Sequence, residues 1–143
     1  MSGPTQEDRP SLLGPHEGRE LDLMLAGKKH LSRFDFEDGA LPTFPQKEFE
    51  QKVADGLFLK DEQIEEYLAP DGSKIVMRKV LYATISEAWR IPAMRMVDDA
   101  YQNLPGWRAD LERLIGSLLG YNSKDVELFI QRLAKNNKLS YDP

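Results

Sequence analysis

The sequence predicts an α+β fold in which a small antiparallel hairpin or sheet is packed by two N-terminal helices and a C-terminal segment of three helices. Three observations lead to this prediction. Apolar residues recur at helical spacing toward both ends of the chain, β-branched and aromatic residues concentrate in residues 74–84, and a Pro-Asp-Gly turn precedes that run. A chain of 143 residues that is 41% hydrophobic and 30% charged has the size and composition of one folded domain.

The two ends of the chain differ from its middle. Residues 1–14 mix glycine, proline and charged residues with few apolar ones, which predicts a mobile leader. We expect a single compact domain over residues 15–138 and a frayed tail over residues 139–143.

Three elements are expected before the hairpin. Leucine and methionine at helical spacing predict a helix over residues 15–26, which Gly27 ends. Residues 30–36 alternate between apolar and polar types and predict a short strand. Residues 43–55 predict a second helix, because a proline stands in the first turn and Gly56 follows the end.

The hairpin is centred on residues 70–73. A brief apolar run at 57–59 and the segment 65–69 have β character, and 65–69 leads into the turn. Proline fixes φ at the first turn position, and glycine accepts a positive φ later in the turn. Residues 74–84 form the returning strand.

Three helices are expected after the hairpin. The first begins beyond Ser86 and breaks at residues 104–106, where the sequence reads Leu-Pro-Gly. Residues 107–119 carry the most regular apolar stripe and form the second, and residues 123–135 form the third. We expect the three to pack as a small bundle against the sheet, and the chain to fray from Asn136.

Composition excludes several kinds of chemistry. The chain has no cysteine and only two histidines, so thiol, soft-metal and most histidine-base mechanisms lack their residues. No apolar run is long enough to cross a bilayer, and residues 1–15 do not have the pattern of a secretory signal. We therefore expect a cytoplasmic protein with no membrane segment and no cofactor.

The net charge of −5 is distributed unevenly. Residues 1–71 hold 16 acidic and 8 basic side chains, a net charge of −8, whereas residues 72–143 hold 8 acidic and 11 basic ones, a net charge of +3. The acidic residues that cluster in the first half are Asp35, Glu37, Asp38, Asp61, Glu62, Glu65 and Glu66. This asymmetry favours a non-catalytic protein-binding module, such as a bacterial-type inhibitor, immunity or adaptor protein, whose partner has a basic surface.

Trp89 and Arg90 are further candidate contacts with a partner protein. Both residue types are enriched among the side chains that anchor protein interfaces. The alternative for Trp89 is packing within the protein, and the sequence leaves both open.

Other functions find weaker support. A metal site would have to combine His16, Glu20 and His30, without a second close histidine pair, so we predict none. Residues 107–135 could imitate a helix-turn-helix, with Lys124, Arg132, Lys135 and Lys138 near phosphates, but the basic density is too low to favour nucleic acid. A small enzyme that uses carboxylate, tyrosine and arginine chemistry stays open, although no nucleophile or phosphate-loop motif is present.

Overall fold

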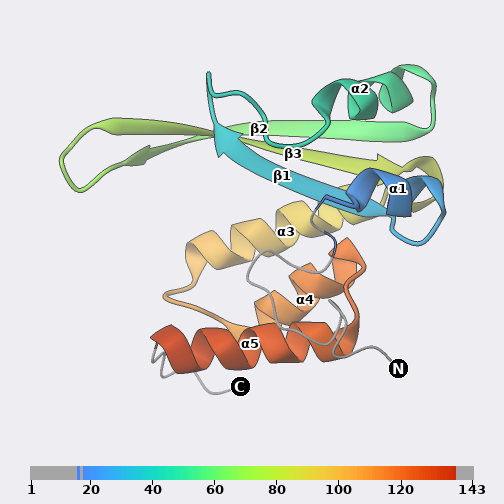
Figure 1. Ribbon diagram of the computed structural model, residues 1–143. Coiled ribbons are helices and arrows are strands. Elements are labelled where there is room, and N and C mark those ends of the chain that lie inside the picture. Colours follow the sequence, from blue (N-terminus) through green and yellow to red (C-terminus); the bar gives the residue numbers. More distant parts are fainter. Residues whose placement is uncertain (1–15, 17, 138–143) are drawn as a thin grey trace.

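The structure is a computed structural model that describes residue 16 and residues 18–137. A three-stranded sheet lies between two groups of helices (Figure 1). The elements in chain order are α1 (Glu20–Leu25), β1 (Leu31–Glu37), α2 (Gln46–Ala54), β2 (Phe58–Leu68), β3 (Lys74–Thr84), the 3₁₀ turn η2 (Ile85–Glu87), α3 (Arg90–Asn103), α4 (Ala109–Leu119) and α5 (Ser123–Asn137). The predicted α+β class is confirmed.

The strands are antiparallel and their order is β1-β3-β2. β3 is therefore the central strand, and both β1 and β2 are edge strands. Successive side chains of a strand point to opposite faces, so β3 supplies two cores. Val80 and Tyr82 pack with Met24 of α1 and Phe49 of α2 on one face. We call this the upper face, after its place in Figure 1.

The opposite face, the lower face, carries the second core. Leu81 and Ala83 of β3 pack there with Met94 of α3 and with Ile115 of α4. α5 packs on α4 through a third, smaller cluster. The three C-terminal helices thus form the bundle below the sheet in Figure 1, as the sequence predicted.

The connection between α4 and α5 depends on two glycines. Gly120 follows α4 with a φ of 82°, a left-handed conformation that residues with a Cβ rarely adopt. Gly116 lies inside α4 against Val126 of α5, and a Cβ on Gly116 would lie 2.5 Å from Val126 Cγ2. The absence of a side chain at Gly116 therefore lets the two helices approach closely.

The outer half of the β2–β3 hairpin projects beyond the helices (Figure 1). We call residues 64–78 the hairpin arm. β1 pairs with β3 only as far as Met77, so the tip of the arm is two-stranded. Ile64, Tyr67 and Leu68 of the arm are 55%, 43% and 79% exposed. An isolated two-stranded hairpin is marginally stable in water. The exposed apolar side chains of the arm are therefore available for contact with a partner.

The observed elements differ from the predicted ones mainly in the hairpin. β2 is one continuous strand, whereas the sequence predicted two shorter pieces separated by polar residues. The polar stretch stays extended because its charges find partners on neighbouring elements: Lys60 with Glu50, and Asp61 with Arg95. Glu62 is paired with Arg78 in the same way.

The ends of several helices also differ from those predicted. α1 begins at Glu20, not at residue 15, and Gly18 before it has a φ of 80°. α2 begins at Gln46 because Pro45 occupies the N-cap, and α5 continues to Asn137, past the point where fraying was expected. The predicted leader and the predicted tail lie outside the described residues.

Candidate functional site

The sheet divides the predicted acidic cluster between its two faces. Side chains two residues apart along a strand share a face, and Arg33 and Leu81 mark the lower one through their contacts with α3 and α4. Asp35, Glu37, Asp61 and Glu65 therefore belong to the lower face, whereas Asp38, Glu62 and Glu66 lie toward the upper one. The seven acidic residues do not form one continuous surface.

Intramolecular cations accompany most of these carboxylates. The pairs are Asp35 with Arg33, Asp38 with Arg78, Asp61 with Arg95, Glu62 with Lys60 and Arg78, Glu65 with Lys79, and Glu66 with Lys74. β2 carries four carboxylates and one lysine, and the adjacent β3 carries three cations. Much of the charge asymmetry along the sequence is thus balanced across the hairpin.

These ion pairs differ in strength because they differ in exposure. The side chains of Glu66 and Lys74 are 57% and 61% exposed, and such surface pairs contribute about 0–1 kcal/mol. The side chains of Glu65 and Lys79 are only 18% and 19% exposed. The hydrogen bond from Lys79 is the largest of several causes that lower the pKa of Glu65. The exposed carboxylates can exchange partners more readily than the covered ones.

Trp89 and Arg90 stand at the start of α3 and have different roles. Trp89 is 54% exposed. The guanidinium of Arg90 lies 4.8 Å from the centre of the Trp89 ring and donates hydrogen bonds to the carbonyl oxygens of Ser117 and Leu118 at the end of α4. A cation at a helix C-terminus is favourable, so Arg90 ties α3 to α4. Trp89 keeps most of its surface available for contact.

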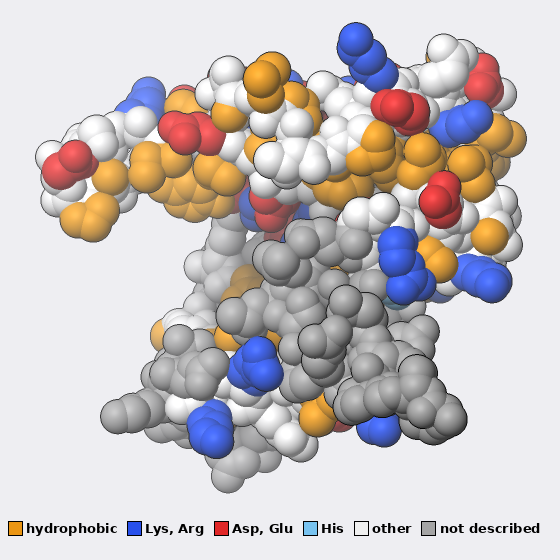
Figure 2. All heavy atoms as spheres, viewed as in Figure 1, with side chains coloured by type: hydrophobic (Ala, Val, Ile, Leu, Met, Phe, Trp, Pro, Cys, Tyr) orange, Lys and Arg blue, Asp and Glu red, His pale blue; other side chains and the backbone are white. Residues whose placement is uncertain are grey.

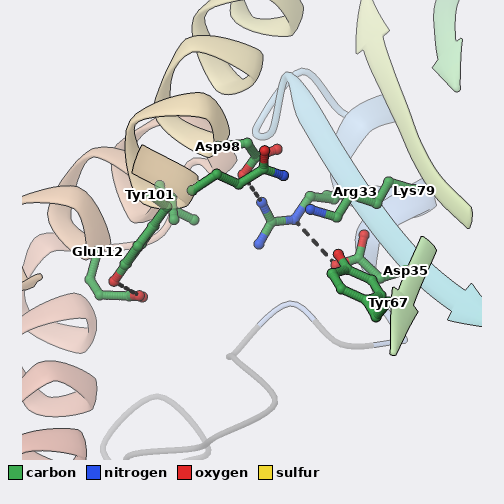
Figure 3. Close-up of a pocket in the computed structure, with 9 residues that line it drawn as sticks. Arg33, Asp35, Tyr67, Lys79, Asp98, Tyr101 and Glu112 are labelled. Carbon is green, nitrogen blue, oxygen red and sulfur yellow. Dashed lines mark hydrogen bonds and ion pairs between the residues drawn. The ribbon is translucent and has the colours of Figure 1, made fainter. Parts of the chain in front are cut away.

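A cleft opens between the hairpin arm and the helices below it, on the face shown in close-up in Figure 3. Its volume is about 320 Å³. The residues that line this arm cleft are Arg33, Asp35, Tyr67, Lys79, Asp98, Tyr101, Gln102, Glu112 and Ile115. β1, β2, β3, α3 and α4 each contribute to it, which is why separate stretches of sequence meet there. Figure 2 shows the hollow below the arm and hydrophobic side chains along the arm itself.

Arg33 crosses the cleft from β1 toward α3 (Figure 3). Its Nη1 lies 3.2 Å from Asp98 Oδ1, and its Nε lies 3.9 Å from Asp35 Oδ2. Burial raises the pKa of Asp98, and the nearby cations Arg33 and Lys79 offset this only in part. Asp98 is therefore a carboxylate whose charge the protein leaves incompletely compensated.

Carboxylates outnumber cations in the arm cleft. Asp35, Asp98 and Glu112 line it together with two cations, and a fourth carboxylate, Glu65, contacts three lining residues. Glu65 accepts hydrogen bonds from Tyr67 at 2.9 Å and from Gln102 at 2.9 Å, besides its pair with Lys79. The cleft therefore favours a positively charged occupant.

Two tyrosines frame the cleft, Tyr67 on the sheet side and Tyr101 on the helical side (Figure 3). The Tyr101 hydroxyl donates to Glu112 at 2.5 Å. Burial, followed by this hydrogen bond, raises the pKa of Tyr101. Burial also raises the pKa of Tyr67, with the hydrogen bond to Glu65 as the next cause. Both phenols stay protonated near neutral pH, so neither supplies a base.

A second charged group is buried near the end of α4. Lys29 is 2% exposed, and its Nζ donates to the carbonyl oxygen of Leu119 at 2.5 Å and lies 3.0 Å from His16 Nδ1. Burial lowers the pKa of Lys29 to about 8. Burial, followed by the charges of Lys29 and Arg19, lowers the pKa of His16 to about 4. A neutral histidine accepting from a charged lysine fits both shifts, and the cluster caps α4.

The structure bears on the alternative sites as well. Among the described residues, no group of three or more His, Asp or Glu side chains is placed to hold a metal ion. Val126 and Ile130 of α5 are buried against Ala109 of α4, so the last helix contributes to the core. Lys124 and Lys135 are exposed on α5, and Lys138 lies outside the described residues.

No described helix has the length and apolar character that a bilayer crossing requires.

Sequence reasoning found Asp35 and Glu65 but missed most of the cleft. Arg33, Lys79 and Asp98 are ordinary charged residues in the sequence, and none belongs to a motif. Strand alternation could have placed Arg33 and Asp35 on one face. The register of β1 with β3 sets Asp35 opposite Lys79, and the packing of α3 beneath the sheet brings Asp98 to Arg33.

Comparisons of the chain with protein-family models, with curated proteins and with solved structures find no match.

Proposed function

We propose that this protein is a non-catalytic protein-binding module that holds a basic segment of a partner protein in the arm cleft. An inhibitor, an immunity protein or an adaptor works through contacts of this kind. The observation that carries the proposal is the excess of carboxylates over cations in an open cleft beneath a projecting hairpin. A lysine or arginine side chain of the partner is the anchor that fits this chemistry.

The electrostatics of the cleft support a cationic anchor. Asp98 lies among Asp35 and Glu65, whose charges add to the effect of burial in raising its pKa. An incoming cation would relieve this repulsion and stabilise the charged form of Asp98. The Asp35 side chain is 39% exposed, and its ion pair with Arg33 is long, with 3.9 Å between Asp35 Oδ2 and Arg33 Nε. Asp35 can therefore turn toward a partner at small energetic cost.

The arm supports contact with a macromolecule. Tyr67 lines the cleft and is 43% exposed, so a partner that entered would cover apolar surface as well as charge. Buried apolar area supplies most of the affinity of an interface, whereas complementary charges supply specificity and fast association. The open shape of the arm cleft suits a side chain carried by a larger surface.

A second candidate function is a small enzyme that uses carboxylate, tyrosine and arginine chemistry. The meeting of Arg33, Asp98 and Tyr101 in one cleft favours it, and the raised pKa of Asp98 suits a general acid. The hydrogen bonds among these groups argue against it, because Tyr101 is engaged with Glu112 and Arg33 with Asp98. Binding therefore ranks first.

The test is affinity capture from the native host, followed by mass spectrometry and by measurement of the dissociation constant for the protein retained. Asp35→Lys reverses a charge inside the cleft. Glu48→Lys makes the same change of charge on exposed α2, outside the cleft, and is the matched control. We expect a basic partner whose affinity falls about tenfold or more with Asp35→Lys and stays unchanged with Glu48→Lys.

Two results would overturn the proposal. One is a partner whose affinity responds equally to both substitutions, since charge in the cleft would then have no special role. The other is the absence of any retained protein together with turnover of a compound in a metabolite panel. Loss of that turnover in Asp98→Asn would establish the enzymatic alternative.

A further inference from the structure

The outer edge of β2 has no strand beside it in the described part of the chain. At 11 residues, β2 matches the central strand β3 in length and is longer than β1. Proteins normally shorten, bend, cover or charge a strand in this position, because its unpaired backbone groups recruit other strands. β2 carries charged side chains at residues 60–62, 65 and 66, but its length and its exposed apolar residues make it a candidate interface.

The hydrogen-bond pattern shows which backbone groups face this edge. The N–H of Ile85 donates to the carbonyl of Leu57, and the N–H of Ala69 donates to the carbonyl of Ser73. Both pairs belong to the β2–β3 register, so odd-numbered residues of β2 bond to β3. The N–H and C=O groups of the even-numbered residues, from Phe58 to Leu68, therefore point outward.

Exposed apolar side chains gather on the same strand. Leu59, Ile64, Tyr67 and Leu68 are 44%, 55%, 43% and 79% exposed. They occur near both ends and near the middle of β2. A partner strand running along the whole edge would give each of them a cross-strand neighbour.

We propose that the chain forms a dimer in which the β2 edges of two copies pair antiparallel about a two-fold axis at Gln63, joining their sheets into one of six strands. Gln63 is the middle residue of β2, so the two strands overlap along their full length. The pairing is isologous and closes on itself, as most soluble dimers do. This interface goes beyond binding of a basic partner and uses the β2 edge, which shares Tyr67 with the arm cleft.

The two-fold axis places the start of β2 in one copy opposite the end of β2 in the second copy. Leu59 faces Tyr67 of the second copy; Phe58, opposite Leu68 of the second copy, is 3% exposed and packs in its own core. Lys60 faces Glu66 of the second copy, and the symmetry makes each of these contacts twice. The hairpin arm of each copy, which its own helices leave uncovered, then lies along the base of the other sheet.

The pair of opposite charges, Lys60 with Glu66, distinguishes this register from its neighbours. With the axis moved one residue to Ile64, Glu62 would face Glu66 of the second copy. With the axis at Glu62, that carboxylate would face itself. Only the axis at Gln63 opposes Lys60 and Glu66, and like charges directly opposite one another destabilise a sheet.

One pair in the chosen register is unfavourable. Asp61 faces Glu65 of the second copy, so two carboxylates approach each other on the lower face. Each already has a cation of its own chain, because Arg95 lies 2.8 Å from Asp61 and Lys79 lies 2.7 Å from Glu65. Glu62 and Glu66, which the axis at Ile64 would oppose, also have cations of their own chain, Arg78 and Lys74, so the Lys60–Glu66 pair is what distinguishes the chosen register.

A cross-linking experiment tests the position of the axis. The chain contains no cysteine, so one introduced thiol reports on one contact. Residues facing each other at Gln63 form a non-hydrogen-bonded pair, with Cα atoms about 4.5 Å apart, within the range that a disulfide spans. Oxidised glutathione should convert two Gln63→Cys thiols to an intermolecular disulfide, whereas Ser73→Cys, an exposed thiol in the hairpin turn, should not cross-link.

A charge-swap experiment tests the register. Glu66→Lys and Lys60→Glu should each raise the dimer dissociation constant about tenfold or more in sedimentation equilibrium, because each places like charges opposite one another twice. An equimolar mixture of the two variants should form a heterodimer, because both opposed pairs become complementary again. Glu48→Lys, with the same change of charge outside β2, should dimerise like the unmodified chain.

Three outcomes would overturn the proposal. They are a chain that remains monomeric at about 1 mM, cross-linking of Gln63→Cys no faster than that of Ser73→Cys, and a charge-swap mixture that associates no better than its components. Circular dichroism of each variant confirms that the fold is intact. Because Glu66 is exposed, Glu66→Lys by itself remains informative should Lys60→Glu fail to fold.

Discussion

The contact between α4 and α5 predicts that alanine at Gly116 destabilises the protein despite its better helix propensity. In an open helix, Gly→Ala adds about 1 kcal/mol of stability. Here the new Cβ would lie 2.5 Å from Val126 Cγ2 and 3.2 Å from Val126 Cγ1. Valine is β-branched and stiff at χ1, so the helices must separate.

The magnitude follows from these opposing effects. Overpacking of a tight contact costs about 1–3 kcal/mol. After the gain in propensity, Gly116→Ala should lower the free energy of unfolding by about 0–2 kcal/mol. In a Val126→Ala background both γ-carbons are absent, and the nearest remaining atom, the Cβ of residue 126, would lie 3.4 Å away, in ordinary contact. Gly116→Ala should then be stabilising, by about 1 kcal/mol.

Urea denaturation of the two single variants and of the double variant measures this coupling. Ser117→Ala, at an exposed position of the same helix, controls for propensity alone. We expect a coupling energy of about 1–3 kcal/mol between positions 116 and 126. Equal stabilisation by Gly116→Ala in both backgrounds would refute the close approach of α4 and α5.

Two further predictions concern the cations at the end of α4, Lys29 and Arg90. Folding lowers the pKa of His16 from 6.5 to about 4 and the pKa of Lys29 from 10.5 to about 8. Between the two pKa values of each residue, the unfolded chain therefore binds more protons than the folded one. Stability should therefore rise with pH from 4 to 6.5 and again from 8 to 10.5, the second rise reaching at most about 3 kcal/mol. Lys29→Met should flatten the upper rise in urea titrations across pH, and an unchanged slope would count against a buried amine. Arg90→Met should lower the free energy of unfolding by about 1–3 kcal/mol, because it frees carbonyl oxygens at the end of α4, and Trp89→Ala by less than about 1 kcal/mol. Thermal unfolding compares the two, and a larger effect at Trp89 would make that residue a packing element.

Periodicity predicted the helices well where one face is buried and the other exposed. The stripe of α4 and the turn at residues 70–73 are local properties, so neighbouring residues in the sequence suffice to recognise them. β2 was predicted only in part, because Lys60, Asp61 and Glu62 look like a loop until Glu50, Arg95 and Arg78 are placed beside them.

The sequence alone determined the fold class, the hairpin turn and the absence of cysteine chemistry, because these depend on composition and on residues close together in the chain. The tertiary structure decided how the charges are used. Pairing of acidic β2 with basic β3 balances charges that look one-sided in the sequence, and the packing of α3 beneath the sheet brings Asp98 to Arg33. Coulomb interactions depend on distance in space, which strand register and helix packing set.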